Sequence, residues 1–117
     1  MDIFIGAEYV IANALIEISK KGDNCITFDK LRSIGWQIQQ FCNQGGINVI
    51  ILTSGSQLKD AIYDFSDYFE YAETGEYEPM IRIKQNTRIE DLEDRFVYCL
   101  PPDVAKLIGE KMPELVA

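Results

Sequence analysis

Two long runs of apolar residues at helical spacing place the strongest constraint on how this chain can fold. In residues 7–20 and again in residues 28–43, apolar side chains recur every three or four positions. The first run ends in a Lys-Lys-Gly sequence, which supplies cations and a glycine at a helix C-terminus. The second can be capped by Thr27 or Asp29 and ends before a pair of glycines. The sequence therefore predicts two amphipathic helices packed against a core, with Trp36 on the flank of the second.

Two segments have the character of β-structure. Residues 47–53 are short, apolar and rich in β-branched side chains, which predicts a central strand covered on both faces. Residues 68–84 contain two β-prone pieces about a glycine, and Ile81 and Ile83 alternate with charged residues. This second segment predicts a hairpin, or at least one exposed edge strand.

Three further helices complete the predicted fold. One runs from residue 56 onward, a second follows a Thr-x-x-Glu capping box over residues 87–90, and the last begins at Pro102. The expected class is α+β, with about five helices around a small two- or three-stranded sheet, in a single domain over residues 1–117. An order of three helices and a hairpin also resembles winged-helix domains, so a winged-helix-like fold is the alternative.

The turn between the predicted strand and the third helix has two interpretations. Thr53, Ser54, Gly55 and Ser56 join an apolar strand to a helix, as in many anion- or nucleotide-binding units. The turn contains one glycine and lacks both the P-loop and the GxGxxG patterns. Ser54 followed by Gln57 instead forms a capping box, which satisfies the first helical amides without a ligand. We expect a structural cap, with an anion- or nucleotide-binding protein or an enzyme that uses residues 53–56 as the alternative.

The composition argues against most catalytic chemistry. The chain has no histidine, and its three cysteines form no CxxC pair. Cys99 falls on an apolar helical stripe, which predicts a buried, inert thiol. We therefore expect no enzymatic activity, no cofactor and no metal. The first apolar stretch carries acidic residues and lacks a basic leader, so we expect neither a signal peptide nor a membrane span, and a cytoplasmic location.

The negative charge is concentrated in one segment. Of the net charge of −8, residues 60–81 carry seven acidic residues and no Lys or Arg, whereas the rest of the chain is nearly balanced. Tyrosines are interleaved with these acids, and tyrosine is favoured at interfaces. The predicted partner-binding residues are Asp60, Asp64, Asp67, Glu70, Tyr71, Glu73 and Tyr77.

This acidic segment favours a protein with a basic surface as the partner. Carboxylates attract a cationic surface and repel nucleic-acid phosphate, so no nucleic acid is expected, even for a winged-helix-like fold. The leading hypothesis is a small acidic protein-binding or inhibitor domain that acts through residues 60–81. An acidic helix face that serves only solubility is the simpler explanation to be tested against it.

Overall fold

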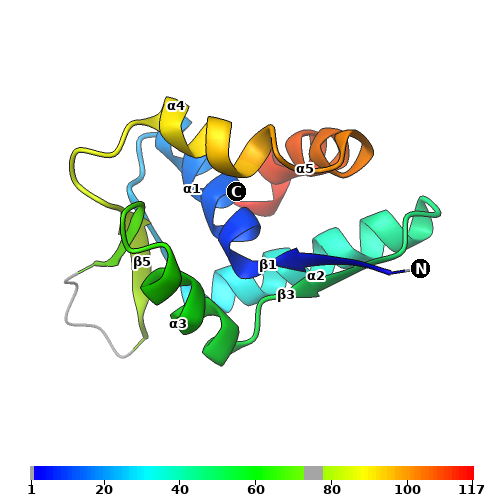
Figure 1. Cartoon of the computed structure of the whole chain (residues 1–117), viewed down its shortest axis with the longest axis horizontal. Helices are drawn as coiled ribbons and strands as arrows, with labels where there is room; N and C mark the ends of the chain where they lie inside the picture. The colour runs from blue at the N-terminus through cyan, green and yellow to red at the C-terminus, as the bar shows by residue number, and fades with distance from the viewer. Residues whose placement is uncertain (1, 73–77) are drawn as a thin grey trace.

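The computed structural model describes residues 2–72 and 78–117 and has an α+β architecture (Figure 1). The described helices are α1 (Ala7–Lys20), α2 (Phe28–Gln44), α3 (Gly55–Asp64), α4 (Ile89–Leu92), which continues into the π-helical turn η1 (Glu93–Val97), and α5 (Pro102–Leu115). The strands are β1 (Ile3–Gly6), β2 (Cys25–Thr27), β3 (Val49–Leu52), β4 (Phe69–Tyr71) and β5 (Met80–Ile83). Five helices with small sheets confirm the predicted fold class.

Helix α1 lies in the middle of the molecule, between α2 and the α4–α5 region (Figure 1). Its two ends match the predicted range of residues 7–20. Most of its surface is buried, because apolar residues occupy nearly every face: Ala7, Val10, Ile11, Ala12, Ala14, Leu15, Ile16 and Ile18. The core of the protein is therefore built around one apolar helix.

Helix α2 begins as the sequence predicts, at a cap formed by Thr27. The Thr27 hydroxyl accepts the backbone N–H of Lys30 at 3.1 Å. The backbone N–H of Asp29 donates to the Glu78 carboxylate at 2.5 Å, and that of Phe28 to the Pro79 carbonyl oxygen at 3.1 Å. The orphan amides of the first turn are thus satisfied by the segment that leads into β5. Trp36 lies on the exposed side of the helix, with 64% of its surface accessible.

Strands β2, β5 and β4 form an antiparallel sheet in that spatial order. The predicted hairpin is confirmed as β4 and β5, and β2 is a third strand that the sequence did not reveal. Ile26, Ile81 and Phe69 are buried on the face of this sheet that packs against the helices. Along the chain the order is α1, β2, α2, β3, α3, β4, β5, and β2 pairs with β5 rather than with its neighbours in sequence.

Strand β3 is not the predicted central strand. It forms a two-stranded parallel sheet with β1, in which Ile3 is opposite Val49 and Ile5 is opposite Ile51. On the other edge of β3, side chains take the place of a third strand. The N–H of Val49 donates to Asn43 Oδ1 at 3.2 Å, and that of Ile51 to Gln39 Oε1 at 2.8 Å. Helix α2 therefore closes this edge of the sheet.

The fourth helix is confirmed, but its predicted cap is wrong. Helix α4 begins one residue later than the Thr-x-x-Glu pattern implies, and the backbone N–H of Arg88 donates to Asp91 Oδ2 at 3.4 Å. The Thr87 hydroxyl instead donates to the carbonyl oxygen of Asp67 at 3.1 Å, which ties this residue to the turn after α3. A long-range bond has replaced the local one. Cys99 follows η1 and is exposed, which also corrects the predicted burial of its thiol.

Candidate functional site

The turn between β3 and α3 forms the capping box predicted from its sequence. The Ser54 hydroxyl accepts the backbone N–H of Gln57 at 3.3 Å, and Gln57 Oε1 accepts the N–H of Ser54 at 3.0 Å. Thr53 is buried, Gly55 is half-buried and Ser56 is exposed. The backbone N–H groups of Ser54 and Gln57, which would otherwise face an anion, are therefore already hydrogen-bonded within the turn.

A hollow of about 310 Å³ lies beside this turn, and its charges are mixed. Arg32 and Lys59 line it together with the carboxylates of Asp29 and Glu78. Asp29 forms an ion pair with Arg32, and Glu78 binds the N–H of Asp29. The cations are thus matched by acids, whereas an anion site needs an excess of donors. Anion binding by residues 53–56 stays a prediction.

Helix α3 presents a charged, aromatic face to solvent. Leu58, Ala61 and Ile62 are buried, whereas Asp60 and Asp64 are exposed on the other side. Lys59 and Tyr63 share the exposed face, and Tyr63 is accessible over 82% of its surface. Asp67, in the turn after α3, is exposed as well. Helix α3 directly precedes the β4–β5 hairpin in the chain.

A groove of about 570 Å³ separates this face of α3 from β4. Ile62 and Phe69 are its buried apolar residues, and the exposed side chains of Tyr63 and Tyr71 line it as well. Tyr71 also stacks on Phe28, with ring centroids 6.2 Å apart, which holds this aromatic ring in place. Asp60, Glu70, Lys59 and Lys84 add charges around the groove. The groove therefore combines buried apolar, exposed aromatic and charged side chains.

Two of the five acidic residues that the structure describes in this segment have structural partners. Glu70 lies opposite Arg82 in the β4–β5 ladder, and its carboxylate accepts both Arg82 Nε and Nη2 at 2.7 Å. Glu78 caps α2, as described above. Their partners lie outside residues 60–81, so the charge count of the segment alone could not reveal them. Glu73 and Tyr77, which the sequence also nominated, lie outside the described residues.

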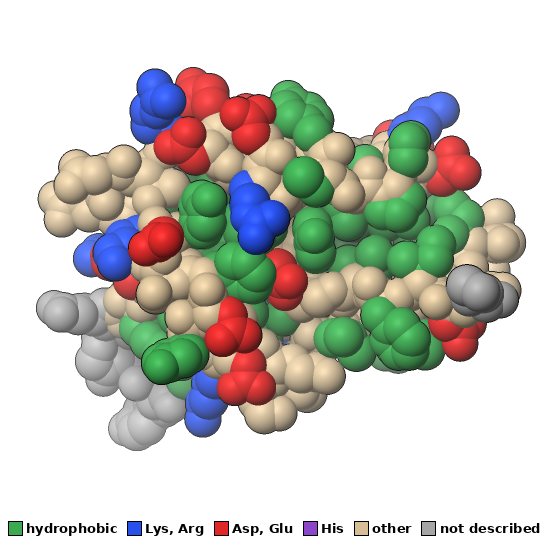
Figure 2. Space-filling view, viewed as in Figure 1, with side chains coloured by type: hydrophobic (Ala, Val, Ile, Leu, Met, Phe, Trp, Pro, Cys, Tyr) green, Lys and Arg blue, Asp and Glu red, His purple; other side chains and the backbone are tan. Residues whose placement is uncertain are grey.

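The fold adds acids from other parts of the chain to the same surface. Glu8, at the start of α1, lines a hollow of about 310 Å³ with Asp60 and Asp64. Asp91 and Asp94 line a second hollow, of about 420 Å³, with Asp67. Figure 2 shows carboxylates gathered over α3 and over α4 on one face of the molecule. No periodicity joins Glu8 to α3, so the sequence offered no signal for this grouping.

Arg95 is a cation within this surface. It lines the hollow that contains Asp67, and its guanidinium carbon lies 5.6 Å from the ring centroid of Phe65. The ring of Phe65 packs edge-on against Phe96, with centroids 5.3 Å apart. A cation held over aromatic rings is stabilised by the ring quadrupole. Arg95 therefore has a structural role in addition to offsetting part of the surrounding charge.

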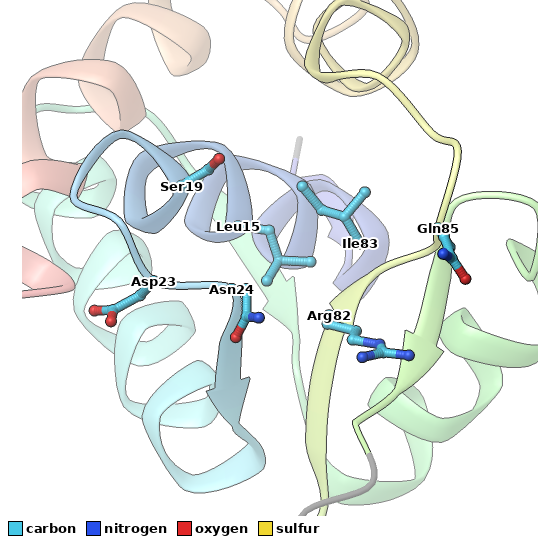
Figure 3. Close-up of a pocket in the computed structure, with 7 residues that line it drawn as sticks. All are labelled: Leu15, Ser19, Asp23, Asn24, Arg82, Ile83 and Gln85. Carbon is cyan, nitrogen blue, oxygen red and sulfur yellow. The ribbon is translucent and has the colours of Figure 1, made fainter.

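A separate pocket of about 330 Å³ lies between α1 and β5 (Figure 3). Leu15 and Ser19 come from α1, Asp23 and Asn24 precede β2, and Arg82, Ile83 and Gln85 come from β5 and the residues after it. Arg82 is already held by Glu70. Among the described residues, no hydrogen bond joins Ser19 to a carboxylate, as an activated hydroxyl would require.

Residues 2–72 and 78–117 contain neither a metal-binding cluster nor a membrane-spanning helix. No group of three or more His, Cys, Asp or Glu side chains is arranged to hold a metal ion. No helix in these ranges is both long enough and apolar enough to cross a membrane. Comparison with protein-family models, with curated proteins and with solved structures finds no match for the chain.

Proposed function

We propose that this protein is a binding module that recognises a basic surface on another protein through the face formed by α3, the following turn and β4. The observation that carries the proposal is that Asp60 lines a groove with Tyr63 and Tyr71, while Asp64 and Asp67 are exposed on α3 and the turn after it. Carboxylates around the groove steer a cationic partner, and the aromatic groove supplies area to bury.

The position of this face in the fold argues against nucleic acid as the partner. In DNA-binding winged helices, the helix before the hairpin and the hairpin itself meet the duplex, and phosphate neutralisation supplies most of the affinity. Here that helix exposes Lys59 against Asp60 and Asp64. An acidic helix in this position suits a basic protein, rather than nucleic acid, as the partner.

The proposal includes no catalysis and a reducing, cytoplasmic setting. All three cysteines are free thiols, and one of them, Cys99, is exposed. Free exposed thiols are typical of compartments in which disulfides do not persist. A domain of this kind would act by occupying the basic surface of its partner, as an inhibitor or regulator does.

The test compares two triple variants that remove the same charge. One is Asp60→Asn, Asp64→Asn, Asp67→Asn on the proposed face; the matched control is Asp103→Asn, Glu110→Gln, Glu114→Gln on α5, where all three side chains are exposed. A partner recovered from cytoplasm with the wild-type chain is then bound to each variant in stopped-flow experiments over a range of salt concentrations. We expect the first variant to associate about tenfold more slowly at low salt and to lose most of its salt dependence.

The control decides whether location or net charge matters. If the α5 variant slows association equally, long-range charge alone is responsible and the α3 face is not the site. If neither variant changes the association rate, the carboxylates serve solubility and the proposal fails. Tyr63→Ala should act differently, by raising the dissociation rate, whereas Tyr98→Ala, which removes a ring that is 70% exposed elsewhere, should leave it unchanged.

The capped turn supports a second candidate, an anion site, through one observation. Arg32 Nη1 lies 3.7 Å from the position that a Cβ on Gly55 would occupy, at the N-terminus of α3. Millimolar phosphate or ATP should then raise the melting temperature of the wild-type chain, because a ligand that binds only the folded state stabilises it. An unchanged melting temperature removes this candidate.

A further inference from the structure

The outer edge of β1 is unpaired within the described residues. Ile3 donates its backbone N–H to the carbonyl oxygen of Asn48 at 2.9 Å, so the backbone groups of Ile3 are turned toward β3. Alternate residues of a strand direct their N–H and C=O groups to opposite sides, so those of Phe4 point away from β3. The Phe4 side chain is exposed over 64% of its surface.

The opposite edge of the same sheet is closed, because Asn43 and Gln39 of α2 accept the outward N–H groups of Val49 and Ile51. This two-stranded sheet can therefore be extended by hydrogen bonding only at β1. Two-stranded sheets are marginally stable, and parallel strands are usually part of larger, covered sheets. An open edge of this kind is a template for another strand.

We infer that β1 pairs in an antiparallel manner with β1 of a second copy of this chain, about a two-fold axis at Phe4. The two Phe4 residues would exchange both backbone hydrogen bonds, and Asp2 of each copy would lie opposite Gly6 of the other. The result is a four-stranded sheet in the order β3, β1, β1, β3. The strand is its own complement, because the outward groups on either side of Phe4 are arranged symmetrically.

The side chains at the axis suit this pairing. The two phenyl rings would lie side by side on one face of the sheet, as in the aromatic pairs that stabilise antiparallel strands. Phe4 shares its face with Ile50, its partner in the ladder, which is partly exposed. Figure 2 shows further hydrophobic side chains gathered around β1 and toward α5.

Charge favours β1 over the other open sheet edges. Strand β4 lies in the acidic segment, and β2 is flanked by Asp23 and Asp29. Near β1 the axis would keep the two Asp2 residues about 14 Å apart, which exceeds the screening length of about 8 Å at physiological salt. Residues 3–6 of β1 themselves carry no charge.

Like charges meet at both ends of this interface, because Glu8, Asp60 and Asp64 line the hollow that contains Gly6. The Glu8 carboxylate lies directly over Gly6 in its own chain, and Asp2 of the second copy would lie beside it. This repulsion and the short strand predict a weak dimer, smaller than the roughly 800 Å² per partner of a stable interface. Asp2→Asn removes the repulsion and should tighten the dimer severalfold.

Sedimentation velocity from about 10 µM to about 1 mM protein tests the inference. We expect the average mass of the wild-type chain to rise from that of a monomer toward that of a dimer, and to rise further in high salt. Phe4→Glu places two carboxylates at the axis and should keep the chain monomeric. The matched control is Trp36→Glu, which removes an aromatic side chain of equal 64% exposure from α2, on the closed side of the sheet, and should leave dimerisation intact.

Several outcomes would overturn the inference: a wild-type chain that stays monomeric at about 1 mM, a Phe4→Glu variant that dimerises normally, or a Trp36→Glu variant that does not dimerise. Circular dichroism melts of all variants confirm that each one folds. The result is independent of the proposed partner binding, which involves α3 and β4 and should weaken with salt, whereas self-association should strengthen.

Discussion

At the scale of single residues, Gly35 and Thr53 set how closely α2 approaches β3. A Cβ atom at position 35 would collide with the Thr53 side chain, which is itself only 8% exposed. This close approach brings Gln39 and Asn43 within hydrogen-bonding reach of the β3 backbone. Thr53, a residue of the alternative anion-binding turn, thus packs against Gly35 of α2.

Two helical glycines should respond to alanine with opposite signs. Gly35→Ala forces a methyl group into Thr53 and should lower the free energy of unfolding by about 1–3 kcal/mol. Gly109→Ala, in α5, points into open space and should raise it by about 0.5–1 kcal/mol through helix propensity. Urea unfolding measures both values. A Gly35→Ala variant as stable as wild type would show that α2 and β3 can separate without cost.

At the scale of elements, helices were predictable where their signals were local. The apolar stripes and caps of α1 and α2 lie within the helices or beside them, so their boundaries were predicted within about one residue. Strands β1 and β2 have four residues or fewer, too short for a periodic pattern, and exist because of partners elsewhere in the chain. The Thr87 bond to Asp67 and the Glu70–Arg82 pair are likewise long-range.

The capping box of α3 should be worth about 1 kcal/mol. Ser54→Ala removes the oxygen that accepts the Gln57 amide and leaves that donor without its partner. Ser66→Ala is the control, because Ser66 is exposed and its hydroxyl forms no hydrogen bond with the described residues, whereas its carbonyl oxygen accepts Lys84 Nζ. Chemical denaturation should show a loss for Ser54→Ala and almost none for Ser66→Ala. Equal values for the two variants would mean that the cap contributes nothing.

At the scale of the whole molecule, apolar and acidic residues are separated around α1. The buried residues form one hydrophobic cluster that includes all eight buried positions of this helix, whereas carboxylates of α1, α3 and α4 share one exposed face. The sequence predicted the acidic segment but not the acids that the fold adds to it or the partners that it supplies. Which charges remain free at a surface depends on tertiary contacts, and no linear count provides that information.

Cys42 reports on the integrity of this core through the pH dependence of stability. Its thiol is fully buried on α2, and desolvation raises its pKa above the ordinary value of 9.0, whereas unfolding returns the pKa to that value. The unfolded chain therefore loses this proton first as pH rises, and the folded state loses stability through this range. Between about pH 8 and about pH 10, the free energy of unfolding should fall more steeply for wild type than for Cys42→Ala, whatever the cost of the cavity at neutral pH.

Cys99→Ala, at an exposed position, should keep the wild-type slope. Identical slopes for wild type and Cys42→Ala would show that the thiol reaches solvent without global unfolding, and that the core around α2 opens locally.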